Sequence, residues 1–235
     1  MKYLFRTIFV FVMVFSMLGS MVCPANAVFR LPEVEEEESE IEVAKGADVP
    51  LYFQDDYPDT PFGGGTVASG GCGITCLAMV ASYLTDTEYL PDELAERYND
   101  VADNNMARME YASEDLELPL QSKIYRGDFD LLIEALENGQ IAIILLNGDS
   151  IFTDAGHFIV LTGISEEGRI FVNDPNKSIY NYNYMMYGFA YGFDQKDIYQ
   201  CFSGAWIFEK KAEEAEDISS DDFWAAYELE SSISS

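Results

Sequence analysis

Hydrophobic residues recur at helical spacing through much of the first half of the chain. Pro91 suits the first position of a helix, and Asn138-Gly139 is typical of a helix C-terminus. A stretch rich in Gly, Pro and Thr, residues 57–69, predicts a loop between the first apolar run and the first helix. The spacing predicts helices over residues 72–84, 91–98 and 129–136, and a weaker one over residues 104–112.

Farther along, the pattern changes to short apolar runs separated by turns that contain glycine. The stretch from Tyr180 to Phe193 is rich in Tyr and Gly without a period, so we expect a long loop over the sheet. Helices first and antiparallel strands afterwards predict an α+β domain, with N-terminal helices packed on an antiparallel β-sheet. The strands are expected at residues 118–125, 141–146, 157–164, 169–173 and 203–208.

The first residues have the pattern of an export signal. Lys2 and Arg6 precede an apolar run, and Ala25-Asn26-Ala27 is a cleavage site of small residues. The run is only about a dozen residues long, shorter than the roughly 20 that span a bilayer. We therefore expect a cleaved signal peptide over residues 1–27; an uncleaved anchor is the alternative.

The remaining chain divides by composition into three segments. Residues 28–48 form an acidic linker that we expect to be disordered, with a pro-segment as the alternative. Residues 49–210 form the folded domain, and residues 211–235 form an acidic, Ser-rich tail.

Charge excludes several classes of partner. The formal net charge is −29, and loss of Lys2 and Arg6 with the signal would make it more negative. No basic patch is available for phosphates, so we expect no binding to nucleic acid and no adsorption to anionic membranes. The signal and the charge predict a secreted or cell-surface protein. We expect its mature form to be a monomer without a membrane span.

The cysteines point to chemistry more than to a disulfide framework. Export would leave Cys72, Cys76 and Cys201, and an odd number outside the cytoplasm implies at least one free thiol. Cys72 and Cys76 would lie one turn apart on the same helix face. An odd number of cysteines is consistent with one free thiol that takes part in a reaction.

Cys72 and the single histidine of the chain, His157, are the strongest candidates for a reactive pair. A neighbouring imidazole and a helix N-terminus both favour the thiolate, which is the nucleophilic form of cysteine. Cys72 heads the predicted helix, and Gly71 and Gly73 beside it leave room for a substrate. The structural alternative is that Cys72 is a small buried residue next to a turn.

His157 begins a predicted strand, after Gly156, which removes bulk at a strand edge that could face a cleft. Asp174 ends the next strand, so an antiparallel hairpin would bring it to the same end as His157. A carboxylate there could hold the imidazole in one tautomer and stabilise its charged form. Asn173 or Asn176 could do the same with an amide, while Asp154 is too close in sequence to His157.

Two further features complete the candidate site. The side-chain amide of Gln54 could donate a second hydrogen bond to an oxyanion, beside the Cys72 backbone N–H. Tyr182 and Tyr184, in the Tyr-rich stretch, could form the wall of a substrate cleft, or they could simply cover one edge of the sheet.

Four motifs follow one another along the chain: Gln54, Cys72-Gly73-Ile74-Thr75 heading a helix, Gly156-His157-Phe158 opening a strand, and Asn173-Asp174-Pro175 ending the next. This series resembles that of the bacteriocin-processing (double-glycine leader) peptidase-like group, a branch of the papain-like cysteine peptidases. The resemblance covers residues 49–208. The chain departs from the group at Ile74, where Pro is frequent, and at Cys76, where Ser or Ala is usual.

The resemblance implies a papain-like fold with Cys72 as nucleophile, His157 as base, Asp174 as its orienter and Gln54 as oxyanion donor. No transporter segment follows the domain, so we expect a free-standing secreted member that acts on a peptide or protein without a cofactor. Hydrolysis and transpeptidation remain open. One alternative is a binding module on the same fold without turnover. Another is a metal site of Cys72, Cys76 and His157, which has too few ligands for a closed structural zinc.

Overall fold

A computed structural model describes residues 45–99, 109–148 and 150–211. The predicted signal peptide, most of the acidic linker, the first part of the 104–112 helix and nearly all of the tail lie outside these residues. Within the described ranges, no helix combines the length and the apolar character that crossing a bilayer would require.

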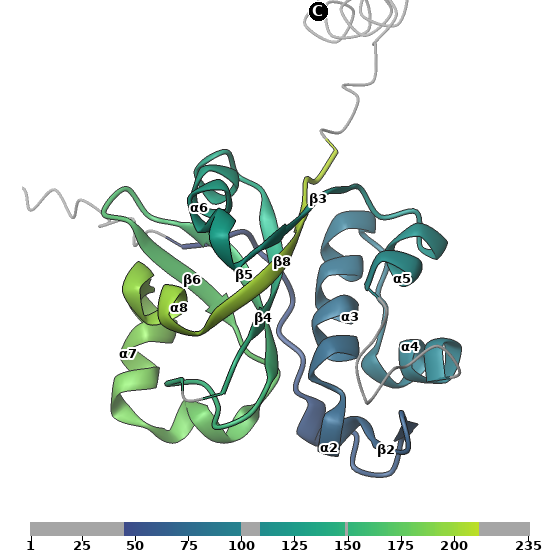
Figure 1. The fold of residues 1–235 in the computed structure, drawn as a ribbon. Coiled ribbons are helices and arrows are strands. Elements are labelled where there is room, and N and C mark those ends of the chain that lie inside the picture. The colour runs from purple at the N-terminus through teal and green to yellow at the C-terminus, as the bar shows by residue number, and fades with distance from the viewer. Residues whose placement is uncertain (1–44, 100–108, 149, 212–235) are drawn as a thin grey trace, which may run out of the picture. The chain divides into compact units, whose positions relative to one another are not determined.

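A six-stranded antiparallel sheet forms the centre of the fold (Figure 1). Three strands have the bounds that the apolar runs predict: β4 (Ile141–Leu146), β5 (His157–Ile164) and β6 (Arg169–Asn173). The strand order is β3-β8-β4-β5-β6-β7. The other strands are β3 (Leu120–Tyr125), β7 (Phe193–Asp194) and β8 (Phe202–Phe208).

The central strands are apolar on both faces because both faces are covered. Alternate residues of β4 enter different cores: Ile143 packs into one, whereas Ile144 packs into the other. Phe158 and Ile159 divide in the same way on β5. Side chains of adjacent strand residues point to opposite faces, so a continuous apolar run is what a strand between two helical layers requires.

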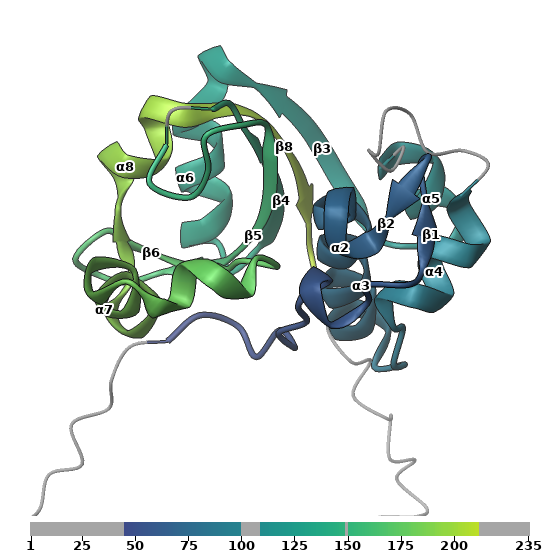
Figure 2. The same cartoon turned by 90° about the horizontal axis from the view of Figure 1, so that it is seen from below.

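Helices from the two halves of the chain cover opposite faces of the sheet (Figures 1 and 2). On one face, α3 packs against β5. This layer contains α3 (Cys72–Thr85), α4 (Pro91–Tyr98) and α5 (Met109–Asp115). The other face is covered by α6 (Phe129–Glu137), α7 (Asn183–Tyr191) and α8 (Gln195–Cys201). The architecture is therefore α+β, with helices on both sides of an antiparallel sheet.

Helix α3 is buried along most of its length, which explains its strong apolar pattern. The helix ends at Thr85, and its C-cap, Asp86, has a φ of 52°, in the left-handed region. Helix α6 ends with Asn138 as its C-cap and is followed by Gly139 at φ 79°, as the pair Asn-Gly predicts.

The loop predicted over residues 57–69 is only partly a loop. It contains β1 (Pro61–Phe62), β2 (Gly65–Thr66) and a single helical turn, α2 (Val67–Gly70). Thr66 and Ser69 cap this turn reciprocally through side chain and backbone. These elements are too short to produce a hydrophobic period, and local capping hydrogen bonds form them.

The prediction of a long loop from Tyr180 to Phe193 is wrong. This region contains the end of the 3₁₀ helix η4 (Lys177–Asn181), then α7 and the start of β7. Helix α7 buries Met185 and Gly188 among exposed tyrosines, so it has little amphipathic pattern. A Cβ at Gly188 would lie 2.2 Å from the Phe193 ring, so this helix depends on close tertiary packing.

The segment before Gln54 joins the two layers. It runs from the side of β6 and α7 to the 3₁₀ helix η1 (Gln54–Asp56) beside α2 (Figure 2). Ala47 N–H donates to the Thr162 carbonyl at 2.7 Å, and Asn173 Nδ2 donates to the Val49 carbonyl at 2.9 Å. These hydrogen bonds position Gln54 between the helical layer and the sheet.

Candidate active site

Cys72 is the first residue of α3 and is partly exposed. The preceding turn, α2, does not continue into α3, because Gly71 between them has φ −91° and ψ 16°. Within the described chain, no hydrogen bond from the Cys72 backbone N–H is present, whereas Thr75 N–H donates to the Gly71 carbonyl. The free N–H groups of the first turn and the helix dipole therefore act near the Cys72 side chain.

Only glycine fits at position 71, because the backbone of Val67 lies too close for a Cβ. A Cβ there would lie 2.6 Å from the Val67 carbonyl oxygen and 2.7 Å from Val67 Cα. Both are backbone atoms of α2, so no side-chain rotation relieves the clash. Gly71 thus permits the tight junction that separates α2 from α3 and places Cys72 at a helix start.

His157 is the first residue of β5, opposite Leu146 of β4, and is only 6% exposed. Asp174 directly follows β6 and is fully buried. The β5–β6 hairpin brings the two together, and His157 Nε2 lies 2.8 Å from Asp174 Oδ1. The His157 ring also interacts with the side chain of Cys72, which lines the same cleft.

Burial alone would lower the pKa of His157. The hydrogen bonds with Asp174 and Cys72 outweigh it and raise the pKa to about 10. The His157 ring is therefore an imidazolium at neutral pH. Burial raises the pKa of Asp174, and the hydrogen bond with His157 opposes this effect.

Asp174 is held by contacts other than its hydrogen bond with His157. The same oxygen, Oδ1, accepts a hydrogen bond from Asn176 N–H at 2.7 Å. The Tyr180 hydroxyl accepts from Asp174 N–H at 3.1 Å and donates to its carbonyl at 3.2 Å. Tyr180 thus holds the backbone of Asp174, a role that the predicted loop did not indicate.

Gln54 lies in η1, and its backbone N–H donates to the Pro175 carbonyl at 2.9 Å. Its side-chain Nε2 donates one hydrogen to the Ala68 carbonyl at 2.8 Å. Ala68 is four residues before Cys72, so its carbonyl would accept from Cys72 N–H in an uninterrupted helix. Gln54 takes this acceptor, and the amide group retains a second hydrogen.

Gln54, Cys72 and His157 line one cleft of about 450 Å³. The rest of its wall consists of Ser69, Gly70, Thr153, Ala155, Gly156, Phe158 and Asn176. The sequence therefore predicted the polar centre of the cleft. Ser69 and Thr153 belong to it without any signal that spacing or composition could have provided.

Three residues expected to contact substrate lie elsewhere. Gly71 is buried against Val67, and a Cβ at Gly73 would contact Phe158 at 3.3 Å and Met109 at 3.4 Å, inside the core. Tyr184 is on α7, and its hydroxyl donates to Asp197 Oδ2 at 2.5 Å. Gly156 lines the cleft, and Tyr182 lines a hollow next to it.

The residues needed for a metal site are not arranged for one. Cys76 is fully buried in the core, and burial raises the pKa of its thiol well above the ordinary value. Among the described residues, no group of three or more His, Cys, Asp and Glu side chains could hold a metal ion.

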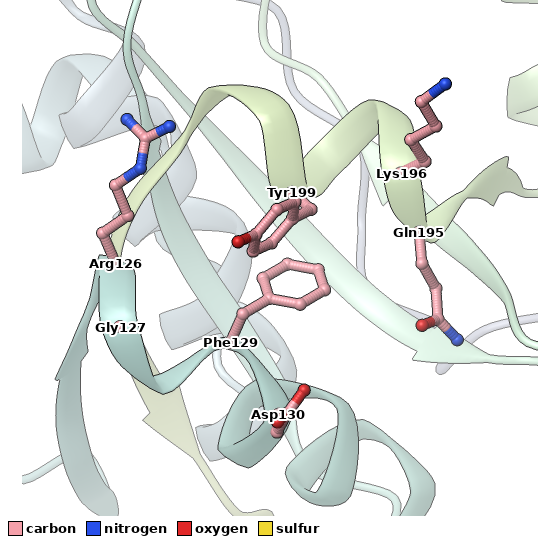
Figure 3. A pocket seen from close by; sticks show the side chains of 7 residues that line it. All are labelled: Arg126, Gly127, Phe129, Asp130, Gln195, Lys196 and Tyr199. Carbon is pink, nitrogen blue, oxygen red and sulfur yellow. The ribbon is translucent and has the colours of Figure 1, made fainter.

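A separate cavity of about 440 Å³ lies where η3 (Arg126–Asp128), α6 and α8 meet (Figure 3). The rings of Phe129 and Tyr199 pack edge to face in it, with centroids 5.2 Å apart. Its lining includes Arg126 and Lys196 but neither a cysteine nor a histidine. It does not supply a nucleophile paired with a base, so the chemistry is assigned to the cleft at Cys72.

No curated protein was found to match the chain. A solved structure, provisionally described as a C39-like peptidase from Bacillus anthracis, is similar over 70% of this chain and 97% of its own length. The two are 16% identical with a TM-score of 0.40, so this likeness supports no statement about activity.

The family comparison is more informative. A family model described as the Peptidase_C39 like family matches residues 47–204. The match includes η1, the start of α3 and the whole β5–β6 hairpin, which together carry the cleft. The chain therefore belongs to the Peptidase_C39 like family, a group of papain-like cysteine peptidases.

Proposed function

We propose that this protein is a secreted cysteine peptidase that hydrolyses peptide bonds with Cys72 as the nucleophile. One observation carries the proposal: the imidazole of His157 connects a buried carboxylate to a thiol at the start of a helix. Neither the carboxylate nor the thiol beside the histidine would alone indicate catalysis. Together they match the arrangement of an activated thiol, in which a nucleophile lies beside a base that a third group orients.

In the first step, the Cys72 thiolate attacks the carbonyl carbon of the scissile peptide bond. A bond forms between sulfur and carbon, and the carbonyl oxygen becomes negatively charged. The Cys72 backbone N–H and the second Nε2 hydrogen of Gln54 are the donors proposed for this oxyanion. The hydrogen bond from Gln54 to the Ala68 carbonyl fixes the plane of the amide before substrate binds.

His157 then transfers its proton to the departing amine, and the carbon–nitrogen bond breaks. The remaining acyl group is a thioester on Cys72. His157, now neutral, takes a proton from water, whose oxygen attacks the thioester carbonyl. Collapse releases the carboxylic acid and restores the thiolate and the imidazolium. Asp174 keeps the ring in one orientation through both steps.

The proposed location is outside the cell, because the N-terminal sequence pattern is that of an export signal. The proposed partner is a peptide or protein substrate, and the proposed mature form is a monomer. An acidic chain without a basic patch is unsuited to nucleic acid.

A mixture of peptides incubated with the mature chain tests the proposal, with mass spectrometry to identify new termini. Wild type should generate new termini, and Cys72→Ala should generate none. Cys201→Ala is the matched control, because Cys201 is buried at the end of α8, outside the cleft lining, and it should cleave like wild type. Peptides that bind but remain intact with wild type would contradict hydrolysis and favour the binding module.

A further inference from the structure

The cleft at Cys72 does not end at the catalytic residues. A second hollow of about 430 Å³ shares three lining residues with it: Thr153, Ala155 and Asn176. Because the same residues line both, the two hollows lie side by side. An extended peptide with its scissile bond at Cys72 would place a nearby side chain in the second hollow.

Both walls of the second hollow are firmly held. The wall before β5 is fixed by Ser150, whose hydroxyl accepts from Phe152 and Thr153 N–H at 3.2 Å and 3.1 Å. Phe152 is buried and packs on Phe193, with ring centroids 5.0 Å apart. The adjacent Ile151 is 39% exposed and lines the hollow.

The opposite wall is connected to the catalytic residues. Asp174 Oδ1, which holds His157, also accepts from Asn176 N–H at the beginning of this wall. Asn176 is the N-cap of η4, and its Oδ1 accepts from Ser178 in the first turn of this helix, which leads to Ile179 and Tyr182. Asn176 Nδ2 has no hydrogen-bond acceptor among the described residues, so it can donate to a substrate carbonyl at the junction.

The lining of the second hollow combines apolar side chains with one negatively charged side chain. Ile151, Ile179 and Tyr182 provide apolar surface, and Asp154 is exposed in the same lining. Among the described residues that line either hollow, none is Lys or Arg. The lysine of η4, Lys177, is paired instead with Asp56 at 2.8 Å. The Asp154 carboxylate has no hydrogen bond or ion pair within the described chain.

We propose that this hollow is a substrate subsite for a lysine or arginine side chain of the peptide. The aliphatic stem would pack on Ile151 and Tyr182, and the cationic head would meet Asp154. Long cationic side chains bind in this way because their stems are apolar and only their ends are charged. The strongly negative charge of the whole chain acts in the same direction. This inference rests on the proposed peptidase activity.

A positional-scanning library of fluorogenic peptides, with Lys, norleucine and Glu at each position near the scissile bond, tests the subsite. Norleucine matches the lysine stem but lacks the charge. At one position, wild type should cleave the Lys peptide about fivefold more efficiently than the norleucine peptide, as expected for one exposed ion pair. In Asp154→Asn this ratio should fall close to one. Asp130→Asn, which removes an exposed carboxylate outside both hollows, should keep it.

Binding of the same peptides to Cys72→Ala separates the subsite from the catalysis. Tighter binding of the Lys peptide that Asp154→Asn abolishes supports the subsite even if wild type hydrolyses nothing, in which case only the peptidase proposal fails. Hydrolysis with equal Lys and norleucine rates at every position overturns the subsite and leaves the peptidase standing. A Lys preference that survives in Asp154→Asn also overturns it.

Discussion

Asp174 Oδ1 lies 2.8 Å from His157 Nε2, across the open end of the β5–β6 hairpin. Asp174 is fully buried, and His157 is nearly so. A charged pair removed from water in this way is stable only when its geometry is good and its remaining atoms are satisfied. Asn176 N–H donates to the Asp174 carboxylate, and the Tyr180 hydroxyl is hydrogen-bonded to the Asp174 backbone, which meets part of that requirement.

Removing the charge of Asp174 should move the alkaline limit of activity to lower pH. Acyl transfer requires the imidazolium of His157, whose pKa is raised to about 10, so wild type should lose activity only near that pH. In Asp174→Asn the carboxylate no longer raises the pKa, whereas burial still lowers it. The measurement is kcat/KM for peptide cleavage from neutral to strongly alkaline pH. An unchanged alkaline limb in Asp174→Asn would show that Asp174 does not set the charge of His157.

Gln54→Ala should lower kcat by about a hundredfold, the typical cost of removing one oxyanion donor. KM should change little, because the bond forms with the charged intermediate. Gln54→Glu is the matched control for size: it keeps the volume but loses the donor, so kcat should fall similarly. Values of kcat close to wild type in both variants would remove Gln54 from the catalytic set.

Gly71→Ala should destabilise the protein by about 1–3 kcal/mol, as other substitutions that overfill packed sites do. The new Cβ would meet backbone atoms of Val67, so α2 or the start of α3 must shift. Urea unfolding gives the free energy, and peptide cleavage should fall as Cys72 moves. Gly127→Ala is the control, because a Cβ there meets nothing within 4 Å. Equal stability in the two variants would contradict the tight α2–α3 junction.

The raised pKa of His157 should also appear in the stability of Cys72→Ala. In this variant residue 72 has no thiol proton to lose when His157, stabilised by the Asp174 carboxylate, gains a proton on folding. Folding then takes up a proton above the unfolded pKa of about 6.5. The stabilisation is complete below that pH and should be lost at up to about 1.4 kcal/mol per pH unit as pH rises toward the folded pKa.

Urea unfolding of Cys72→Ala at several values of pH between 6.5 and 8.5 measures this slope. In Cys72→Ala/Asp174→Asn the His157 pKa is no longer raised by a carboxylate, so the fall should disappear. The same slope in both variants would contradict a charge interaction between His157 and Asp174.

The sequence predicts best where many residues share one environment. The bounds of β4, β5 and β6 follow from apolar runs that fill two cores, and α3 follows from a long buried period. The pairing of His157 with Asp174 follows from hairpin geometry, since residues at the two open ends of a hairpin are neighbours.

Prediction fails where a single tertiary contact decides the structure. Helix α7 forms because Gly188 packs against Phe193, and neither residue indicates this contact alone. Tyr184 therefore lies on a helix and binds Asp197 instead of lining the cleft. The position of Thr153 in the cleft depends on the turn around Ser150, which no periodic pattern encodes.

The central claim is that His157 activates Cys72, and the rate of alkylation by iodoacetamide tests it most directly. The site of modification is identified by mass spectrometry in the folded protein at neutral and mildly acidic pH. The rate for Cys72 should fall at least about tenfold in His157→Ala, whereas the buried Cys76 and Cys201 should label slowly in both proteins. Slow and equal labelling of all three thiols in wild type, or fast labelling of Cys72 that persists in His157→Ala, would contradict the account.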